Sequence, residues 1–289
     1  MLERMARPLR GLSNGIATAT DAVYRPLGRP GRLLQDLLNG SWLGHSVHAV
    51  LVDVVIGGTT MALFLDVLRV LFGVDHLEIA ATWVLGLAWL AALGAILSGL
   101  TDYKDTSPNS AERDVTGLHG LVNIVATLVF TVSLVQRLNS AHDAAFWVLL
   151  IGYLIVTAGG YMGGHVVFKY GYMVNHNAFS RGKRAKEFTP VAAVADLPEA
   201  TPTKVMFGTT AVMVVRRGEV VHALKETCAH AGGPLSEGEL KDDTITCPWH
   251  SSVFRTADGS VVHGPAGSRQ VFYRARVSEG QVELQGPYD

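Results

Sequence analysis

Thr227-Cys-Ala-His-Ala-Gly-Gly-Pro-Leu235 and Cys247-Pro-Trp-His-Ser-Ser-Val-Phe254 are the two stretches that decide how the last third of this chain folds. Each places a cysteine and a histidine in one short loop, and the chain has no other cysteines. Two thiolates and two imidazoles on facing loops can hold a 2Fe-2S cluster with both histidines on one iron. The same donors can hold a structural zinc ion. The sequence therefore predicts a metal centre at Cys228, His230, Cys247 and His250.

These stretches, together with His263-Gly-Pro-Ala266, closely resemble the Rieske 2Fe-2S family. The flanking Gly-Gly-Pro-Leu and Pro-Trp residues match the family at positions that a zinc site would not need. The resemblance implies a 2Fe-2S cofactor, with Cys228 and Cys247 on one iron and His230 and His250 on the other. It also implies a small all-β domain, which we expect over residues 189–289.

The residues around the last ligand bear on the reduction potential. High-potential members of the resembled family clamp the two loops with a disulfide and carry a serine and a tyrosine shortly after the last histidine. Ser252 stands where those members have the serine and would contact the cluster without ligating iron. Phe254 stands in place of the tyrosine and lacks its hydroxyl, and no cysteines remain for a disulfide. Hydrogen bonds to the sulfurs tune such clusters. We therefore expect a potential below the quinol-oxidising class and near or above the soluble ferredoxin class.

Short runs rich in β-branched residues predict an antiparallel set of strands in the same region. They cover residues 205–207, 211–215, 220–224, 244–246, 271–277 and 281–285. Residues 216–219 and 278–280 predict hairpin connections between neighbouring strands.

Four apolar runs precede this domain, at residues 47–72, 79–100, 118–138 and 145–167. Each has about the twenty residues needed to cross a bilayer as a helix. The predicted fold is therefore an α-helical membrane bundle of four transmembrane helices followed by a small all-β domain. We expect an amphipathic or disordered basic arm over residues 1–44, the membrane domain over 45–170 and a basic juxtamembrane linker over 171–188.

The segment Gly40-Ser-Trp-Leu-Gly-His-Ser-Val-His48, with Gly99-Leu-Thr-Asp102, resembles a four-helix bacterial membrane domain of uncertain function that is often fused to Rieske modules. This second resemblance covers roughly residues 40–170 and implies an architecture without a known chemistry.

The distribution of basic residues predicts the orientation in the membrane. An even number of spans returns the chain to its starting side, and Lys and Arg are retained on the cytoplasmic side. One face carries Arg4, Arg7, Arg10, Arg25, Arg29, Arg32, Lys104, Arg113, Lys169, Arg181, Lys183, Arg184 and Lys186, and the other only Arg69 and Arg137. We expect both termini and the Rieske domain to be cytoplasmic, at the inner (cell) membrane. Asp66 and Arg69 are one helical turn apart, which predicts a local ion pair.

Four histidines of the membrane domain are expected at the cytoplasmic ends of the spans: His45, His48, His119 and His165. Ionisable residues within spans often mark a pathway or ligand site. Histidines on separate helices can ligate haem b, or a histidine with a carboxylate can serve a quinone. They can also simply cap helix ends, hydrogen-bond one another or hold another ligand, so three interpretations remain open.

Composition and missing motifs limit the function. The net charge is −1 and no strongly basic patch points to nucleic acid. No Gly-x-Gly-x-x-Gly follows a strand, and no segment could form an oxygenase domain with a two-histidine, one-carboxylate iron. The sequence thus predicts a one-electron carrier, an oxidoreductase component that works between an electron donor and acceptor and lies in the lipid bilayer. The alternative is a membrane-tethered iron–sulfur sensor whose redox state changes a protein contact.

Overall fold

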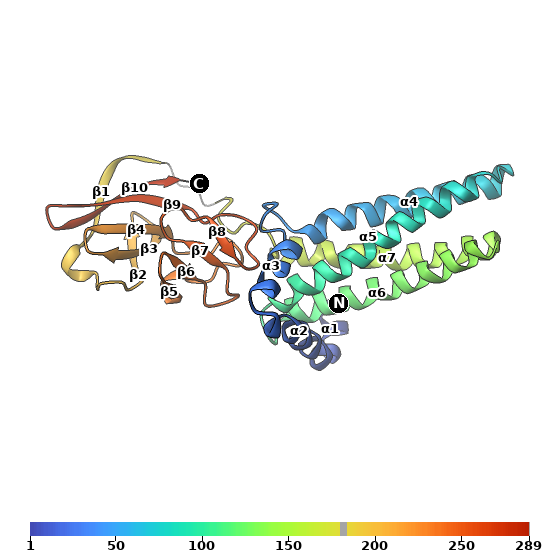
Figure 1. The fold of residues 1–289 in the computed structure, drawn as a ribbon, viewed down its shortest axis with the longest axis horizontal. Coiled ribbons are helices and arrows are strands. Elements are labelled where there is room, and N and C mark those ends of the chain that lie inside the picture. The colour runs from blue at the N-terminus through green and yellow to red at the C-terminus, as the bar shows by residue number, and fades with distance from the viewer. Residues whose placement is uncertain (180–183, 289) are drawn as a thin grey trace. The chain divides into compact units, whose positions relative to one another are not determined.

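The computed structural model describes residues 1–179 and 184–288, which form two compact units (Figure 1). The first unit contains Met1–Leu27 and Ser46–Tyr170, and the second contains Gly28–His45 and the chain from Gly171 onward. Arg181 and Lys183 of the expected basic linker lie outside the described residues.

Four long helices form the core of the first unit: α4 (Val47–Phe72), α5 (Leu77–Lys104), α6 (Ala111–Leu138) and α7 (His142–Tyr170). All four are long and apolar enough to cross a membrane, with mean hydropathies of 1.8 to 2.0. Only 22% to 33% of each most apolar window is buried inside the bundle. Large apolar side chains such as Trp83 and Leu128 therefore face outward, as they do where lipid replaces water. The prediction of four membrane helices is confirmed.

Local chemistry explains where these helices end. Gly73 closes α4 in the left-handed conformation (φ 65°), where glycine meets no Cβ penalty. Ser110 begins α6, because its hydroxyl accepts the backbone N–H of Arg113 at 3.0 Å. The connections between α4 and α5 and between α6 and α7 are only a few residues long, so each of these helix pairs is an antiparallel hairpin.

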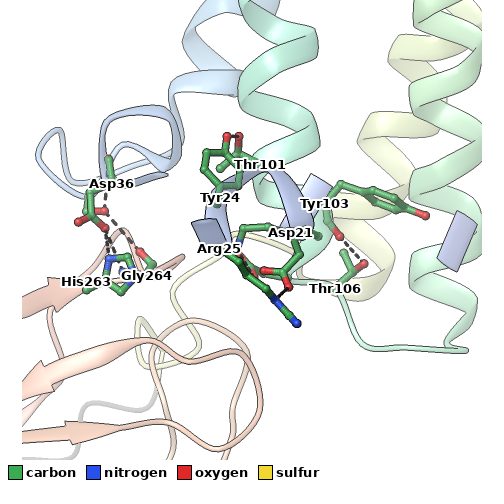
Figure 2. A network of polar contacts seen from close by, with 12 residues as sticks. Asp21, Tyr24, Arg25, Asp36, Thr101, Tyr103, Thr106, His263 and Gly264 are labelled. Carbon is green, nitrogen blue, oxygen red and sulfur yellow. Dashed lines mark hydrogen bonds and ion pairs between the residues drawn. The ribbon is translucent and has the colours of Figure 1, made fainter. Parts of the chain in front are cut away.

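Short N-terminal helices pack on one end of this bundle. They are α1 (Leu2–Ala6), η1 (Arg7–Leu9), α2 (Arg10–Tyr24) and η2 (Arg25–Leu27). Arg10 forms an ion pair of 2.6 Å with buried Asp114 on α6, and the Tyr24 hydroxyl contacts Thr101 Oγ1 on α5 at 2.6 Å (Figure 2). Lys169 and Tyr170 both donate to Glu3, which lowers the pKa of that carboxyl to about 2. Most of the arm is thus helical.

A fully buried ion pair joins two helices at the other end of the bundle. Arg137 on α6 holds both carboxylate oxygens of Asp66 on α4, and both side chains are 1% exposed or less. Arg69 instead pairs with Asp143 at the start of α7, at 2.8 Å. The predicted local pair between Asp66 and Arg69 is therefore wrong. The guanidinium of Arg137, on another helix, reaches Asp66 in the bidentate geometry that a carboxylate prefers.

The second unit is built on a six-stranded antiparallel sheet in the order β1-β10-β9-β4-β3-β2 (Figure 1). Its strands are β1 (Ala185–Ala193), β2 (Thr203–Phe207), β3 (Thr210–Arg217), β4 (Val220–Lys225), β9 (Phe272–Ser278) and β10 (Gln281–Tyr288). Both predicted hairpins form: Arg217 pairs with Val220, and Ser278 pairs with Gln281. At the second turn Glu279 and Gly280 both have positive φ, as a two-residue hairpin loop requires.

A smaller four-stranded sheet in the order β5-β6-β7-β8 completes the unit. These strands are β5 (Glu239–Lys241), β6 (Thr244–Thr246), β7 (Val253–Arg255) and β8 (Val261–His263). Of them, the sequence analysis predicts only β6, because three-residue strands carry too little pattern to recognise. Short helices η3 (Val194–Asp196) and η4 (Leu235–Glu237) lie in the connections. Helix α3 (Gly28–Asn39), which precedes the membrane helices in sequence, also belongs to this unit.

Candidate iron–sulfur site and membrane histidines

Two loops carry the four candidate cluster ligands. The first loop follows β4 and contains Cys228 and His230, and the second joins β6 to β7 and contains Cys247 and His250. Each loop closes on itself through backbone hydrogen bonds. Cys228 N–H donates to Gly233 O at 2.9 Å, and Cys247 N–H donates to Ser252 O at 2.8 Å. Both loops are thus shaped by their own backbones, and each presents one sulfur and one imidazole.

Gly233 allows the two loops to approach each other closely. A Cβ at this position would lie 2.8 Å from Cys247 Sγ and 3.0 Å from the ring of Trp249. Any side chain would therefore push the second loop away from the first. This contact gives a physical reason for the second glycine in the Gly-Gly-Pro-Leu stretch.

The four candidate ligands are arranged as two like pairs. The thiols of Cys228 and Cys247 are hydrogen-bonded to each other. The rings of His230 and His250 lie with their centroids 5.1 Å apart at an interplanar angle of 84°. Among the described residues, no group of three or more His, Cys, Asp or Glu side chains is placed to hold a single metal ion. Two sulfurs on one side and two imidazoles on the other suit a two-iron cluster better than one tetrahedral zinc ion.

Unpartnered buried atoms support the fit of a cluster here. His230 is 5% exposed, and neither of its ring nitrogens has a hydrogen-bond partner within the described residues. Ser252 is fully buried, and its hydroxyl is likewise without a partner there. Buried polar groups almost always have partners. An iron–sulfur cluster would take a nitrogen lone pair of His230 and a hydrogen bond from Ser252.

The environment shifts the pKa values of the candidate ligands in opposite senses: His230 is kept neutral, whereas Cys228 is kept protonated. Burial, aided by the neighbouring His250 and His176, lowers the pKa of His230 to about 3, so its imidazole is neutral and can donate a lone pair. The hydrogen bond from the Cys228 thiol to Cys247 Sγ raises the pKa of Cys228 and lowers the pKa of Cys247 to about 7, because the two buried sulfurs share one proton. Loading the cluster must displace that proton, since only thiolates ligate iron.

Sequence reasoning missed the residues that hold the first loop in place. Gln270 is fully buried just before β9; its Oε1 accepts Ala229 N–H at 2.8 Å, and its Nε2 donates to Thr227 O at 2.7 Å. Asn177 also donates to Thr227 O, at 3.0 Å, and His176 N–H donates to Ala229 O. These residues come from two distant segments, so no local pattern could have identified them.

The His-Gly-Pro loop is held by helix α3. Asp36 Oδ1 lies 2.7 Å from His263 Nδ1 and accepts Gly264 N–H at 3.1 Å (Figure 2). Gly264 has a φ of +96°, and a Cβ there would lie 2.8 Å from Ser251 O in the second ligand loop. The contact therefore connects a helix from the N-terminal arm to the loop that packs against Ser251 and Ser252, next to His250 in the sequence.

The four membrane histidines have different surroundings in the structure. His48 on α4 and His119 on α6 lie together, with ring centroids 6.2 Å apart. His165 on α7 packs its ring against Tyr170, and its Nε2 has no hydrogen-bond partner in the described part of the chain. His45 belongs to the second unit, where its backbone lies against Gly267. His48 and His119 are thus brought into ring contact with each other.

Comparison with known proteins identifies both parts of the chain. Residues 187–279 match the Rieske [2Fe-2S] domain, and residues 44–176 match a predicted membrane protein family (DUF2231). Ferredoxin CarAc of Metapseudomonas resinovorans is 32% identical over 97 residues, which cover 33% of this chain and 91% of that protein. The chain belongs to the Rieske [2Fe-2S] family. Its β-domain is a Rieske electron-transfer domain that carries a 2Fe-2S cluster, and its helical bundle is a membrane domain.

Two further relatives differ in how much they share with this Rieske protein. The anthranilate 1,2-dioxygenase ferredoxin subunit of Burkholderia cepacia is 29% identical over 34% of this chain and 91% of its own length. The cytochrome bc1 complex Rieske iron-sulfur subunit of Streptomyces lividans is 37% identical, over 25% of this chain and 43% of that protein. The similarity to the ferredoxins therefore covers almost their whole length, whereas less than half of the bc1 subunit is matched.

Phe254 gives a direct test of how the Rieske domain sets its potential. Its ring is fully buried at the centre of β7, opposite Ile245, in the cluster of apolar residues that includes both cysteines. We expect Phe254→Tyr to raise the reduction potential, because the added hydroxyl can donate to a cluster sulfur and stabilise the more negative reduced state. A hydrogen bond to a charged group contributes about 1.5 kcal/mol or more, which corresponds to about 60 mV for one electron. Redox titration monitored by EPR measures the shift.

The matched control for this variant is Phe207→Tyr, which adds the same hydroxyl at the end of β2, where the ring packs against Tyr273 in the other apolar cluster of the domain. It should leave the potential unchanged. An unchanged or lowered potential in Phe254→Tyr would contradict the role assigned to this position.

Proposed function

We propose that this Rieske protein is a one-electron carrier of the inner membrane whose cluster works on the cytoplasmic side and passes electrons to an acceptor in the membrane, either quinone or haem. In this proposal Cys228 and Cys247 ligate one iron, His230 and His250 ligate the other, and Ser252 donates a hydrogen bond to the cluster. The observation that carries it is the pairing of two thiols and two imidazoles around unpartnered polar atoms.

The exposure of the second ligand loop supports exchange of electrons with a protein partner. His230 is buried, whereas His250 is half-buried and its neighbour Trp249 is 57% exposed. An exposed aromatic residue beside a ligand provides contact area for a transient redox complex. The matched relatives are named a ferredoxin and a dioxygenase ferredoxin subunit, which favours a separate protein as electron donor.

The proposed orientation is supported by the distribution of Lys and Arg between the two ends of the bundle, and by the ion pairs of Arg69 and Arg137. The connections at the far end of the bundle, residues 73–76 and 139–141, contain no Lys or Arg. Arg69 and Arg137, the two basic residues near that end, are held in ion pairs with Asp143 and Asp66. Within the same unit, Arg10, Lys104, Arg113 and Lys169 lie at the opposite end of the helices, which the positive-inside rule assigns to the cytoplasm.

Helix α3 adds a contact with the bilayer surface. Leu33, Leu34 and Leu37 share one face at i, i+3 and i+4 spacing and are all exposed. Trp42 follows, 66% exposed, with its indole N–H donated to Leu37 O at 3.1 Å. Arg29 and Arg32 are exposed on the same helix. Leucine, tryptophan and arginine in this arrangement suit an interfacial helix on anionic lipid.

Electron transfer itself is tested on the purified full-length protein in lipid nanodiscs. Reduced cluster should give a Rieske-type EPR signal that disappears, one electron per chain, when a water-insoluble quinone analogue is added as acceptor. Bovine serum albumin in place of the quinone analogue is the control. A cluster that cycles reversibly with chemical reagents but never delivers its electron to quinone or to a haem in the same protein would contradict the proposal.

Reporter fusions test the orientation. A green fluorescent protein fused after Tyr288 should fluoresce, and alkaline phosphatase at the same position should be inactive, because both report the compartment. Fusions after Asn139, in the α6–α7 connection, should show the opposite pair of results. Active phosphatase at the C-terminus would overturn the cytoplasmic assignment.

A further inference from the structure

The membrane domain contains an internal repeat of two helical hairpins, α4–α5 and α6–α7. His48 and Asp66 stand at the same separation along α4 as His119 and Arg137 along α6. Trp83, Ala95 and Gly99 are spaced along α5 as Trp147, Gly159 and Gly163 are spaced along α7. Equivalent positions of the two hairpins meet, since Asp66 pairs with Arg137 and His48 contacts His119.

Each histidine of the pair is fixed by the second helix of its own hairpin. His48 Nδ1 lies 2.8 Å from Ala95 O, and His119 Nδ1 lies 2.8 Å from Gly159 O. A carbonyl oxygen can only accept, so these contacts place the proton of each imidazole on Nδ1 and leave a lone pair on Nε2. The Asn123 amide, 3.2 Å from His119 Nδ1, makes its shorter hydrogen bond to His119 O at 2.8 Å, which is compatible with this tautomer. Metal-ligating histidines are typically held in this way, with the second ring nitrogen donated to a carbonyl. Neither Nε2 has a hydrogen-bond partner within the described residues.

Glycines make room for both rings at equivalent positions. A Cβ at Gly99 would lie 2.8 Å from His48 Nδ1, and a Cβ at Gly163 would lie 2.9 Å from His119 Cε1. The ring centroids are 6.2 Å apart, with planes at 80°. Metal–imidazole bonds measure about 2 Å, so two rings on opposite sides of one metal have centroids about 6 Å apart.

The number of donors identifies the class of ligand. A bare metal ion is typically held by three or four protein ligands, and no group of three or more His, Cys, Asp or Glu side chains is placed for one in the described residues. A haem brings four nitrogens of its own and needs only two axial ligands. A quinone needs no second imidazole at this separation and angle.

We propose that His48 and His119 are the axial ligands of a haem b bound between the two hairpins. This inference rests on the proposed function, because it names the acceptor of that same electron path. The reduced 2Fe-2S cluster would give up one electron and return to its oxidised state, and the ferric haem would take that electron and become ferrous. No proton or bond is exchanged in this step.

The test uses full-length protein purified in detergent from cells supplied with the haem precursor 5-aminolevulinate. The wild type should show a Soret band, sharp α and β bands after dithionite, and one haem b per chain by the pyridine haemochrome assay. His48→Ala and His119→Ala should each lose at least tenfold in bound haem, whereas His76→Ala, at the other end of the bundle, should keep it. Helical circular dichroism shows that the bundle of each variant is folded, and the 2Fe-2S EPR signal of the same samples shows that its Rieske domain is loaded.

A rescue experiment separates ligation from a structural role. His119→Gly leaves an open position, and added imidazole should restore a low-spin, six-coordinate spectrum in this variant but not in the His48→Ala/His119→Gly double variant. Haem absent from folded, cluster-loaded wild type would overturn the inference, even if quinone co-purifies. Haem retained in the double variant, or lost only in His165→Ala, would also overturn it. Absence of the cluster itself would instead count against the proposed function.

Discussion

Cys247→Ser should eliminate the Rieske EPR signal and the bound iron and acid-labile sulfide. Serine has nearly the same shape as cysteine, but its hydroxyl is a poor ligand for iron in a 2Fe-2S cluster. The only other cysteine of the sequence, Cys228, is itself a candidate ligand, so no other thiol can take the place of Cys247. His230→Gln should have the same effect, since the buried imidazole loses its lone-pair nitrogen. Iron and sulfide analysis together with EPR at low temperature makes the measurement.

His222→Gln is the control for this series. His222 is half-buried in the same domain, but its Nδ1 contacts Thr256 Oγ1 at 2.8 Å, away from both ligand loops. This variant should keep full cluster content, and Ser252→Ala should keep the cluster while lowering its potential. Wild-type cluster content in Cys247→Ser or His230→Gln would show that the ligands are assigned wrongly.

Arg137→Met should be the most destabilising substitution in the membrane domain. Its guanidinium and the Asp66 carboxylate are both inaccessible to solvent, and each is the other's counter-ion. Removing one partner of a buried ion pair leaves an uncompensated charge and typically costs about 3–5 kcal/mol, and the surrounding lipid offers no water to compensate. The free energy of unfolding in mixed micelles of increasing dodecyl sulfate, followed by helical circular dichroism, measures this loss.

Two comparison variants make the result specific to the buried charge. Asp143→Asn breaks the neighbouring pair with Arg69, but Asp143 is 89% exposed, so the loss should be below about 1 kcal/mol. The double variant Asp66→Leu/Arg137→Met removes both charges and should recover most of the stability lost in Arg137→Met. Equal destabilisation by the double and single variants would indicate lost packing instead of an unpaired charge.

The sequence was most informative where chemistry is concentrated in short segments. The spacing of Cys228 with His230 and of Cys247 with His250 was sufficient to predict a metal centre. The flanking Gly-Gly-Pro-Leu and Pro-Trp residues, through their resemblance to the Rieske family, then implied a 2Fe-2S cofactor. Apolar runs of bilayer length predicted the four helices, since the bilayer requires each span to satisfy its own backbone hydrogen bonds. Neither prediction required knowledge of distant contacts.

No local sequence pattern identified the residues that complete these sites. Gln270 and Asn177 support the first ligand loop from segments far away in the chain, and nothing next to them indicates that role. Histidine positions in the spans suggested four candidates, but only the packing of the helices selects His48 and His119. Helix periodicity shows which residues share a face and leaves open which helix lies opposite.

The sequence by itself determined the cofactor class, the number of membrane helices and the all-β character of the last domain, because each depends on residue type and on spacing along a single segment. Only the tertiary structure decided that Asp66 pairs with Arg137 in place of Arg69, that Asp36 holds His263 and Gly264, and that the histidines of two hairpins meet. These contacts join residues far apart in the chain. Their geometry follows from the packing of whole elements, which bury polar groups only where a partner on another element satisfies them.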